Sequence, residues 1–214
     1  MKPLRIALAK GRLMDEALAL FARLGAPLHP EDAGSRRLVW RSADGRFEFL
    51  PLKGFDVPLY VEAGVADAGV VGSDVLDELE PDVLQPLDLG FGRCRMVVAS
   101  APDVPYPDWN GGVLPRVATK YPAIARRALA RRGVQAELVR VTGSVEAAPL
   151  LGLAHWIVDL TETGRTLRDN GLVVRDVIGE TSARWIVNRA SHKLRLAEHR
   201  DLQRALERAL ATPD

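Results

Sequence analysis

The sequence predicts an α/β protein with two lobes, each holding a mostly parallel sheet flanked by helices, and with a ligand cleft between the lobes. Two observations support this fold class. Short apolar segments with strand character alternate along the chain with amphipathic segments of helical character. A glycine-containing break near residues 89–92 and a loop rich in Pro, Gly and Asp at 101–112 then divide the chain into two α/β parts.

The first part is expected to begin with a buried strand and to end with a short helix. Strands are expected at residues 4–9, 38–40, 47–50 and 68–71, and helices at 15–24, 56–63 and 73–79. Asp44-Gly45 is a hairpin signal between the second and third strands. Pro58 suits the first turn of its helix, and Ser73 or Asp74 can cap the next one.

The second part repeats the alternation. Strands are expected at 94–99, 117–119, 136–141, 156–158, 172–178 and 184–187. Helices are expected at 122–132, after a cap at Ser144, and after the turn that begins at Thr163. A long C-terminal helix is expected at 194–210, because its apolar residues share one face.

The bulk composition narrows the function classes. The chain has 29 basic and 28 acidic residues and a net charge of +1, which does not support nucleic acid as its main ligand. A single cysteine, Cys94, excludes an internal disulfide and suits a reducing cytoplasm, where we expect the protein to work. The N-terminal apolar stretch is too short for a signal peptide, and no run of about 18 apolar residues suits a membrane span.

Signatures of several other chemistries are absent from the sequence. The four histidines are scattered without the spacing of zinc ligands. No P-loop, dinucleotide-binding fingerprint or nucleophile elbow occurs. The sequence therefore gives no indication of covalent nucleophilic catalysis.

The most informative segment is residues 159–167, where an apolar strand ends on a carboxylate and a Thr-Gly-Arg-Thr turn opens a helix. Backbone N–H groups at a helix start suit a phosphate. Thr163 and Thr166 add hydroxyl donors, and Gly164 lets the backbone approach closely. Asp159 suits the hydroxyls of a sugar, so the segment predicts a ribose 5-phosphate site. The alternative is a capped helix after a buried strand.

Basic loops follow the first strand of each part. Residues 4–9 lead into Lys10-Gly11-Arg12, and residues 117–119 lead into Lys120-Tyr121-Pro122. Ligands of such sheets bind at the carboxyl ends of strands, so these loops and residues 159–167 can face one cleft. Lys10-Gly11-Arg12 suits a polyphosphate, although a solvated charged loop would look the same.

Three weaker candidates have simpler alternative explanations. Lys53 precedes a helix, and composition alone favours an ordinary surface lysine over a phosphate contact. Ser73 and Asp74 end a strand and can contact a base or ribose, or serve only as a helix cap. Glu146 can reach a ribose, although an acid in the first turn of a helix is favoured in any case.

The order acid, Thr-Gly-x-Thr resembles the loop that binds 5-phosphoribosyl 1-pyrophosphate (PRPP) in phosphoribosyltransferases. Many of those enzymes carry two adjacent acids. Here Val158 stands in the first position and only Asp159 remains, which argues against a nucleotide-salvage enzyme.

Further segments resemble the short form of ATP phosphoribosyltransferase, the first enzyme of histidine biosynthesis. They cover nearly the whole chain in that family's order: residues 4–13, 56–69, 72–76, 116–122, 143–149 and 159–171. The resemblance implies a fold like that of type II periplasmic binding proteins, with the chain crossing twice between lobes. Lobe I is then 1–91 plus 180–214, and lobe II is 92–179 and carries the PRPP loop at 159–167.

The resemblance also implies a reaction and partners. ATP and PRPP condense to N1-(5-phosphoribosyl)-ATP and pyrophosphate, with Mg²⁺ carried mainly by the substrate phosphates and no protein ligand assigned. A short form lacks the C-terminal regulatory domain of the long form and works with a regulatory subunit resembling histidyl-tRNA synthetase. We expect a homodimer within such a hetero-oligomer.

Roles for individual residues follow from these matches. The catalytic residues are expected to be Asp159, Lys10 and Arg12. PRPP is assigned to Asp159, Thr161, Glu162, Thr163, Gly164, Arg165, Thr166 and Glu146. ATP and pyrophosphate are assigned to Lys10, Gly11, Arg12, Lys53, Ser73 and Asp74. One departure is that Lys53-Gly54-Phe55 replaces the family's frequent Arg-x-Arg, so the second cation is missing.

Two competing functions remain open from sequence. A non-catalytic cytosolic ligand-binding module of the same two-lobed fold would not normally carry residues 159–166. A different phosphoribosyltransferase is disfavoured by the missing second acid. Turnover of Mg-ATP with PRPP separates an enzyme from a binding module.

Overall fold

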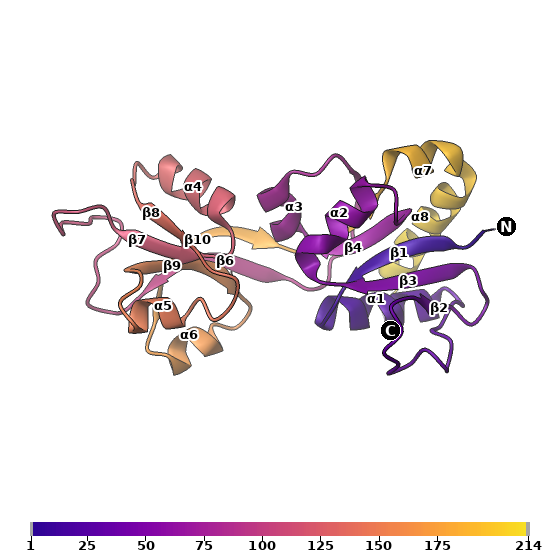
Figure 1. The fold of residues 1–214 in the computed structure, drawn as a ribbon, viewed down its shortest axis with the longest axis horizontal. Coiled ribbons are helices and arrows are strands. Elements are labelled where there is room, and N and C mark those ends of the chain that lie inside the picture. The colour runs from indigo at the N-terminus through magenta and orange to yellow at the C-terminus, as the bar shows by residue number, and fades with distance from the viewer. Residues whose placement is uncertain (1, 213–214) are drawn as a thin grey trace. The chain divides into compact units, whose positions relative to one another are not determined.

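The chain forms two compact units, which are described separately (Figure 1). The structure is a computed structural model that describes residues 2–212. Unit 1 comprises residues up to Leu76, 80–92 and the chain from Ser182 on, and unit 2 comprises 77–79 and Arg93–Thr181. The main divisions thus fall after residues 92 and 181, beside the crossings expected after 91 and 179.

Unit 1 is built on a six-stranded mixed sheet in the order β2-β3-β1-β4-β11-β5. Its strands are β1 (Leu4–Ala9), β2 (Trp40–Arg41), β3 (Phe47–Leu52), β4 (Ala68–Gly72), β5 (Leu84–Asp88) and β11 (Ala183–Val187). β1 runs parallel to β3 and β4, whereas β2 and β11 pair antiparallel with their neighbours. The predicted parallel strands therefore form the centre of a mixed sheet.

Helices cover both faces of this sheet. They are α1 (Arg12–Arg23), α2 (Val57–Glu62), α3 (Ser73–Leu79), α7 (Arg189–Leu194) and α8 (Leu196–Ala211), with a 3-10 turn η1 (Gly54–Asp56) before α2. One buried cluster joins Ile6 and Leu8 of β1 to Phe21 of α1 and Leu206 of α8. A second cluster joins other strand residues to α2 and α3. Each face of the sheet therefore has its own core.

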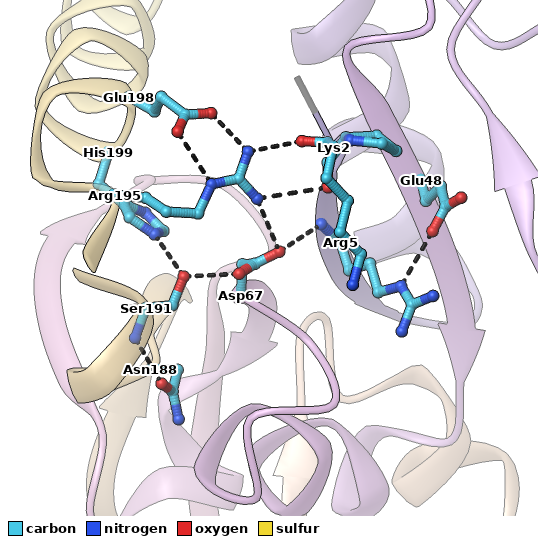
Figure 2. Close-up of polar contacts among 10 residues, drawn as sticks. Lys2, Arg5, Glu48, Asp67, Asn188, Ser191, Arg195, Glu198 and His199 are labelled. Carbon is cyan, nitrogen blue, oxygen red and sulfur yellow. Dashed lines mark hydrogen bonds and ion pairs between the residues drawn. The ribbon is translucent and has the colours of Figure 1, made fainter. Parts of the chain in front are cut away.

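A polar network ties the C-terminal helices to the amino ends of β1 and β4 (Figure 2). The Asp67 carboxylate accepts hydrogen bonds from the Arg5 N–H at 2.8 Å and from Ser191 Oγ at 2.6 Å, and lies 3.4 Å from an Arg195 nitrogen. Ser191 Oγ also lies 2.9 Å from His199 Nε2. This network lies at the end of the sheet opposite to the carboxyl ends of β1 and β4.

Unit 2 is built on a five-stranded mixed sheet in the order β10-β6-β9-β7-β8. Its strands are β6 (Cys94–Ser100), β7 (Arg116–Thr119), β8 (Glu137–Arg140), β9 (Trp156–Thr161) and β10 (Val173–Thr181). β7 runs parallel to both β8 and β9, and β6 pairs antiparallel with β9 and β10. The predicted α/β class, with two lobes that each hold a sheet flanked by helices, is confirmed, but both sheets are mixed rather than mostly parallel.

Helices again lie on both faces in unit 2. In Figure 1, α4 (Pro122–Arg131) lies above the sheet, and α5 (Ala147–Leu150) and α6 (Arg165–Asp169) lie below it. A buried cluster joins Val97, Ala118 and Ile157 of the sheet to two residues on the lower side, Val145 just before α5 and Leu167 of α6. This packing fixes the loops that leave the carboxyl ends of β8 and β9.

Candidate functional site

The carboxyl ends of β7, β8 and β9 meet at one edge of the unit 2 sheet, because the three strands are parallel. The register pairs Thr119 with both Val158 and Arg140. The segments that follow these strands therefore leave the sheet side by side: residue 120, residues 141–146 and residues 159–166. Crevices at such an edge are where open α/β sheets bind ligands. The structure thus brings the predicted PRPP loop and Glu146 to one edge.

Asp159 lies within β9, one residue beyond the last pair with β7. Its side chain is nearly buried, with 9% of its surface exposed, and its Oδ1 accepts a hydrogen bond from the Leu160 N–H at 2.9 Å. This bond helps to fix the direction of the carboxylate. An oriented, shielded carboxylate is well suited to accept hydrogen bonds from sugar hydroxyls, as predicted for Asp159.

The loop from Thr161 to Thr166 is held by its own threonines. Thr161 Oγ1 accepts the Gly164 N–H at 2.9 Å, and Thr163 Oγ1 lies 3.4 Å from the Arg165 nitrogen. Gly164 has φ of 71°, a left-handed conformation that favours glycine. Glu162, Thr163, Arg165 and Thr166 are exposed. The loop is therefore a preformed turn with accessible hydroxyl groups.

The helix after this turn is short. α6 has only five residues, so its dipole is small and the loop amides and hydroxyls must supply most of the attraction for an anion. Arg165 lies in its first turn, with its Nε 3.5 Å from Asp169 Oδ2. Both side chains are largely exposed, so this pair contributes little to stability.

Glu146 lies at the amino end of α5 and is half-buried. The prediction that Ser144 caps this helix is wrong: the cap position is Glu146, and no side chain makes a capping bond there. Ser144 instead has φ of 47°, an uncommon conformation for a residue other than glycine. The turn it makes carries the chain from β8 to Glu146 at the same edge as Asp159.

A cationic edge forms in unit 1 at the carboxyl ends of β1 and β3. Ala9 pairs with Leu52 in register, so Lys10 and Lys53 follow neighbouring strands, and the Lys10 N–H donates to the Leu52 carbonyl at 2.8 Å. Both lysines are exposed. Arg12 follows Lys10 by two residues. The three cations of unit 1 that were predicted to bind anions, Lys10, Arg12 and Lys53, therefore lie at this edge.

The Lys10–Arg12 loop depends on a glycine. Gly11 has φ of 97° and immediately precedes α1, which begins at Arg12 rather than at the predicted Asp15. Arg12 therefore stands in the first turn, with its Nε 3.5 Å from Glu16 Oε1. Both side chains are partly exposed, so the guanidinium is accessible to a ligand.

Ser73 and Asp74 lie at the carboxyl end of β4, but both are buried. The prediction that one of them caps α3 is wrong, because the cap position is Gly72 and no side chain makes a capping bond. Ser73 Oγ accepts the Ser182 N–H at 3.2 Å, and the Asp74 carboxylate occupies the space that a Cβ on residue 72 would need. Their surroundings give both residues a structural role.

Other hollows and clusters do not coincide with these edges. A hollow of about 1080 Å³ in unit 1 is lined by Leu4, Phe47 and residues of α8, at the amino ends of β1 and β3. Across residues 2–212, no group of three or more His, Cys, Asp or Glu side chains is arranged to hold a metal ion. Within the same residues, no helix has the length and apolar character that crossing a bilayer requires.

The fold and the two edges define a class of protein: a two-unit α/β protein with the predicted sugar-phosphate loop on one unit and exposed cations on the other. A family model described as ATP phosphoribosyltransferase matches residues 53–208. An ATP phosphoribosyltransferase of Sorangium cellulosum is 51% identical over 210 residues, which cover 98% of this chain and 97% of the relative. The chain belongs to the ATP phosphoribosyltransferase family.

Solved structures agree with this family and with the expected fold. The ATP phosphoribosyl transferase (HisG:HisZ) complex from Thermotoga maritima contains a chain that matches with a TM-score of 0.82 and 31% identity, covering 97% of this chain and 98% of that one. The periplasmic aliphatic sulphonate binding protein SsuA from Escherichia coli matches with a TM-score of 0.62 at 16% identity and covers 99% of this chain and 73% of that one. The second match shows the fold alone.

Proposed function

We propose that this chain condenses ATP with PRPP to N1-(5-phosphoribosyl)-ATP and pyrophosphate, the first step of histidine biosynthesis. One observation carries the proposal: in a chain related over its whole length to an ATP phosphoribosyltransferase, Asp159 and the Thr161–Thr166 loop lie together at a strand edge. Both substrates are charged metabolites that do not cross membranes, so we propose a cytoplasmic location.

The chemistry is a direct displacement in which adenine N1 attacks the anomeric carbon of PRPP while pyrophosphate leaves. The bond from N1 to carbon forms as the bond from carbon to the pyrophosphate oxygen breaks, and the enzyme supplies positioning and electrostatic stabilisation. Asp159, with Glu146, orients the ribose hydroxyls. The residues from Thr161 to Thr166 hold the 5-phosphate through backbone amides and hydroxyl groups. Unit 2 is thus the PRPP-binding lobe.

The cations of unit 1 are suited to the phosphates of the other substrate. Lys10, Arg12 and Lys53 neutralise ATP phosphates or the leaving pyrophosphate, and the Gly11 backbone lets a phosphate approach. Ser73 and Asp74, which are buried in unit 1, support this edge from β4. Lys53 acts as a single point charge, where an Arg-x-Arg segment would offer two forked cations.

Mg²⁺ is the expected cofactor, and it would enter on the substrate phosphates. Mg²⁺ prefers oxygen ligands, keeps several waters and is often bound through phosphates with few protein ligands. The exposed hydroxyls at Thr163 and Thr166 and the nearly buried Asp159 are compatible with such a complex. When bound, the ion would neutralise charge on the pyrophosphate group.

A regulatory partner is the second part of the proposal. The similar Thermotoga maritima chain was solved as a HisG:HisZ complex. We infer that this chain is likewise a catalytic subunit, forms a homodimer, and works with a regulatory subunit resembling histidyl-tRNA synthetase. The competing function, a non-catalytic ligand-binding module, has only the fold-level likeness to binding proteins in its favour.

The test mixes the purified chain with Mg-ATP and PRPP and measures pyrophosphate release and the nucleotide product, with and without the regulatory subunit. We expect release that requires both substrates and equals the product formed. Controls omit ATP or PRPP, so that hydrolysis of either substrate alone is recognised. Binding of PRPP without turnover, even with the regulatory subunit present, would favour the module.

A further inference from the structure

Lys120 is a cation at the carboxyl edge of the unit 2 sheet for which the assignments above give no role. Ala118 on β7 pairs in register with Ile157 on β9, and both are buried in one core cluster, so they share a face of the sheet. Two residues further along lie Lys120 and Asp159. Because side chains alternate with period two, Lys120 continues the β7 row on the face where Asp159 continues the β9 row.

The backbone on both sides of Lys120 is fixed by Thr119, which is fully buried. Thr119 Oγ1 donates to the Val158 carbonyl at 2.7 Å and accepts the Tyr121 N–H at 2.9 Å. The Thr119 carbonyl accepts the Val141 N–H at 3.0 Å. These three bonds hold residue 120 between the strand that carries Asp159 and the loop that leads to Glu146.

Lys120 is half-buried, and among the described residues its side chain has neither an ion pair nor a hydrogen bond. Two arginines of unit 2, by contrast, have partners: Arg132 pairs with Asp176, and Arg175 binds the Ser100 hydroxyl and nearby carbonyl groups. A half-buried lysine whose side chain has no partner is available to an anion. An anionic ligand at this edge would supply the missing partner.

We propose that Lys120 is a further substrate-binding residue that contacts the pyrophosphate group of PRPP; this inference rests on the proposed function. Asp159 and the Thr161–Thr166 loop hold the ribose and the 5-phosphate at the end of β9. Neighbouring strands lie about 4.8 Å apart, so the other charged end of PRPP can reach the β7 end of the edge. A lysine there neutralises charge that grows on pyrophosphate as it leaves.

The test compares three ligands that differ in the group Lys120 is expected to contact. Binding of ribose 5-phosphate, PRPP and pyrophosphate is measured by titration calorimetry with Mg²⁺ for the wild type, Lys120→Gln and Lys120→Arg. We expect Lys120→Gln to weaken the binding of PRPP and of pyrophosphate about 10- to 100-fold and to leave the dissociation constant of ribose 5-phosphate within about twofold of the wild type. Lys120→Arg keeps the charge and should recover most of the lost affinity. Lys193→Gln, an exposed lysine of α7, is the matched control.

Each other outcome has a definite meaning. An equal loss for all three ligands, or no loss, refutes the contact between Lys120 and pyrophosphate. If the wild type releases pyrophosphate and Lys120→Gln binds PRPP as tightly as the wild type does, this inference is refuted while the proposed function stands. A wild type that neither binds PRPP nor turns over refutes the proposed function itself. Thermal unfolding of each variant verifies folding, and Lys120→Ala replaces Lys120→Gln if the latter does not fold.

Discussion

The carboxylate of Asp159 is held in a fixed direction, and the proposed reaction needs such a carboxylate beside the ribose. The residue is 9% exposed and its carboxylate accepts the Leu160 N–H, so the direction of the carboxylate is constrained before a ligand arrives. In the displacement reaction the ribose develops positive charge, and an oriented carboxylate beside its hydroxyls favours that state. The substitution Asp159→Asn keeps the size and removes the charge. We expect kcat/KM for PRPP to fall on the order of 100-fold or more.

The control for this prediction is Asp103→Asn, an exposed acid in a loop of the same unit. Steady-state rates of pyrophosphate release at several PRPP concentrations give kcat and KM for both variants. Activity of Asp159→Asn within a few-fold of the wild type would contradict the assignment of this carboxylate to the ribose.

Gly164 occupies a position whose backbone conformation favours glycine over every other residue. Its φ of 71° is strained for any residue with a Cβ, and a Cβ there would lie 3.3 Å from an Arg168 nitrogen. We expect Gly164→Ala to lower the free energy of unfolding by about 1 kcal/mol or more and to raise KM for PRPP, because the loop between Thr161 and Thr166 must shift.

Gly171 provides a matched control for that prediction. It has φ of 68°, and a Cβ there meets nothing within 4 Å. Gly171→Ala should therefore cause a similar loss of stability without changing KM for PRPP. Chemical denaturation and steady-state kinetics on both variants separate the two effects. If both variants alter KM equally, the loop has no special role in binding PRPP.

The elements that the sequence predicts best are those with clear signals at both ends. The strand at 4–9 and the helix at 73–79 agree with β1 and α3, because apolar runs there end at charged or small residues. β5 was missed, since its segment contains Pro86 and does not alternate. It is an edge strand paired only with β11, and edges tolerate proline. The C-terminal helix expected at 194–210 agrees with α8, whereas α7, which precedes it and ends before Arg195, was missed.

The candidate site was predictable in its parts rather than in its arrangement. Residue types at 159–166 indicate a sugar-phosphate loop from local chemistry alone. The register that sets Lys120 beside Asp159 depends on pairing between strands far apart in sequence, which no local pattern encodes. The caps expected at Ser73 and Ser144 were wrong for two different reasons. Ser73 is buried, and Ser144 has a positive φ, so neither side chain caps a helix despite the usual preference for serine there. The family assignment is confirmed by the comparisons.

The α7–α8 junction contains a buried histidine whose titration opposes folding in acid. Burial lowers the pKa of His199 below its ordinary 6.5, although Asp67 acts in the opposite direction. Because Ser191 Oγ donates to Asp67, the His199 Nε2–H donates to Ser191, and Nδ1 has no partner among the described residues (Figure 2). A proton on Nδ1 would therefore be buried without an acceptor.

The sign of the pH dependence follows from linkage. As the pH falls below 6.5, the unfolded chain binds a proton at this position before the folded chain does, so the free energy of unfolding decreases. We expect His199→Gln, which can still donate to Ser191, to lose less stability than the wild type between pH 7.5 and about 5. Chemical denaturation at several pH values measures this.

A second histidine accounts for part of the same slope. Burial also lowers the pKa of His155, in unit 2, and the nearby Arg116 adds to that effect. The variant His155→Gln measures its share separately, and the double variant should have the smallest slope of all. An unchanged slope in His199→Gln would show that His199 does not titrate during unfolding.

In the molecule as a whole, the two sheet edges carry different chemistry. The unit 1 edge has three exposed or partly exposed cations, Lys10, Arg12 and Lys53. The unit 2 edge combines two carboxylates, Asp159 and Glu146, with hydroxyl-bearing turns and a single lysine, Lys120. A triphosphate matches the first edge and a sugar phosphate matches the second. Each unit is therefore expected to bind mainly one substrate.

This division of labour predicts that PRPP binds in the absence of ATP and that the two units can be impaired separately. We expect Lys10→Ala to leave the dissociation constant of PRPP alone within about threefold of the wild type, while KM for ATP rises about 10-fold and kcat falls. Asp159→Asn should weaken PRPP binding in the same assay. The control Lys193→Ala, at an exposed lysine of α7, should change neither quantity.

Titration calorimetry with PRPP, followed by steady-state kinetics with ATP varied, makes the comparison. Loss of PRPP binding in Lys10→Ala would mean that a cation of unit 1 contacts PRPP directly, and the one-substrate-per-unit division would then be wrong.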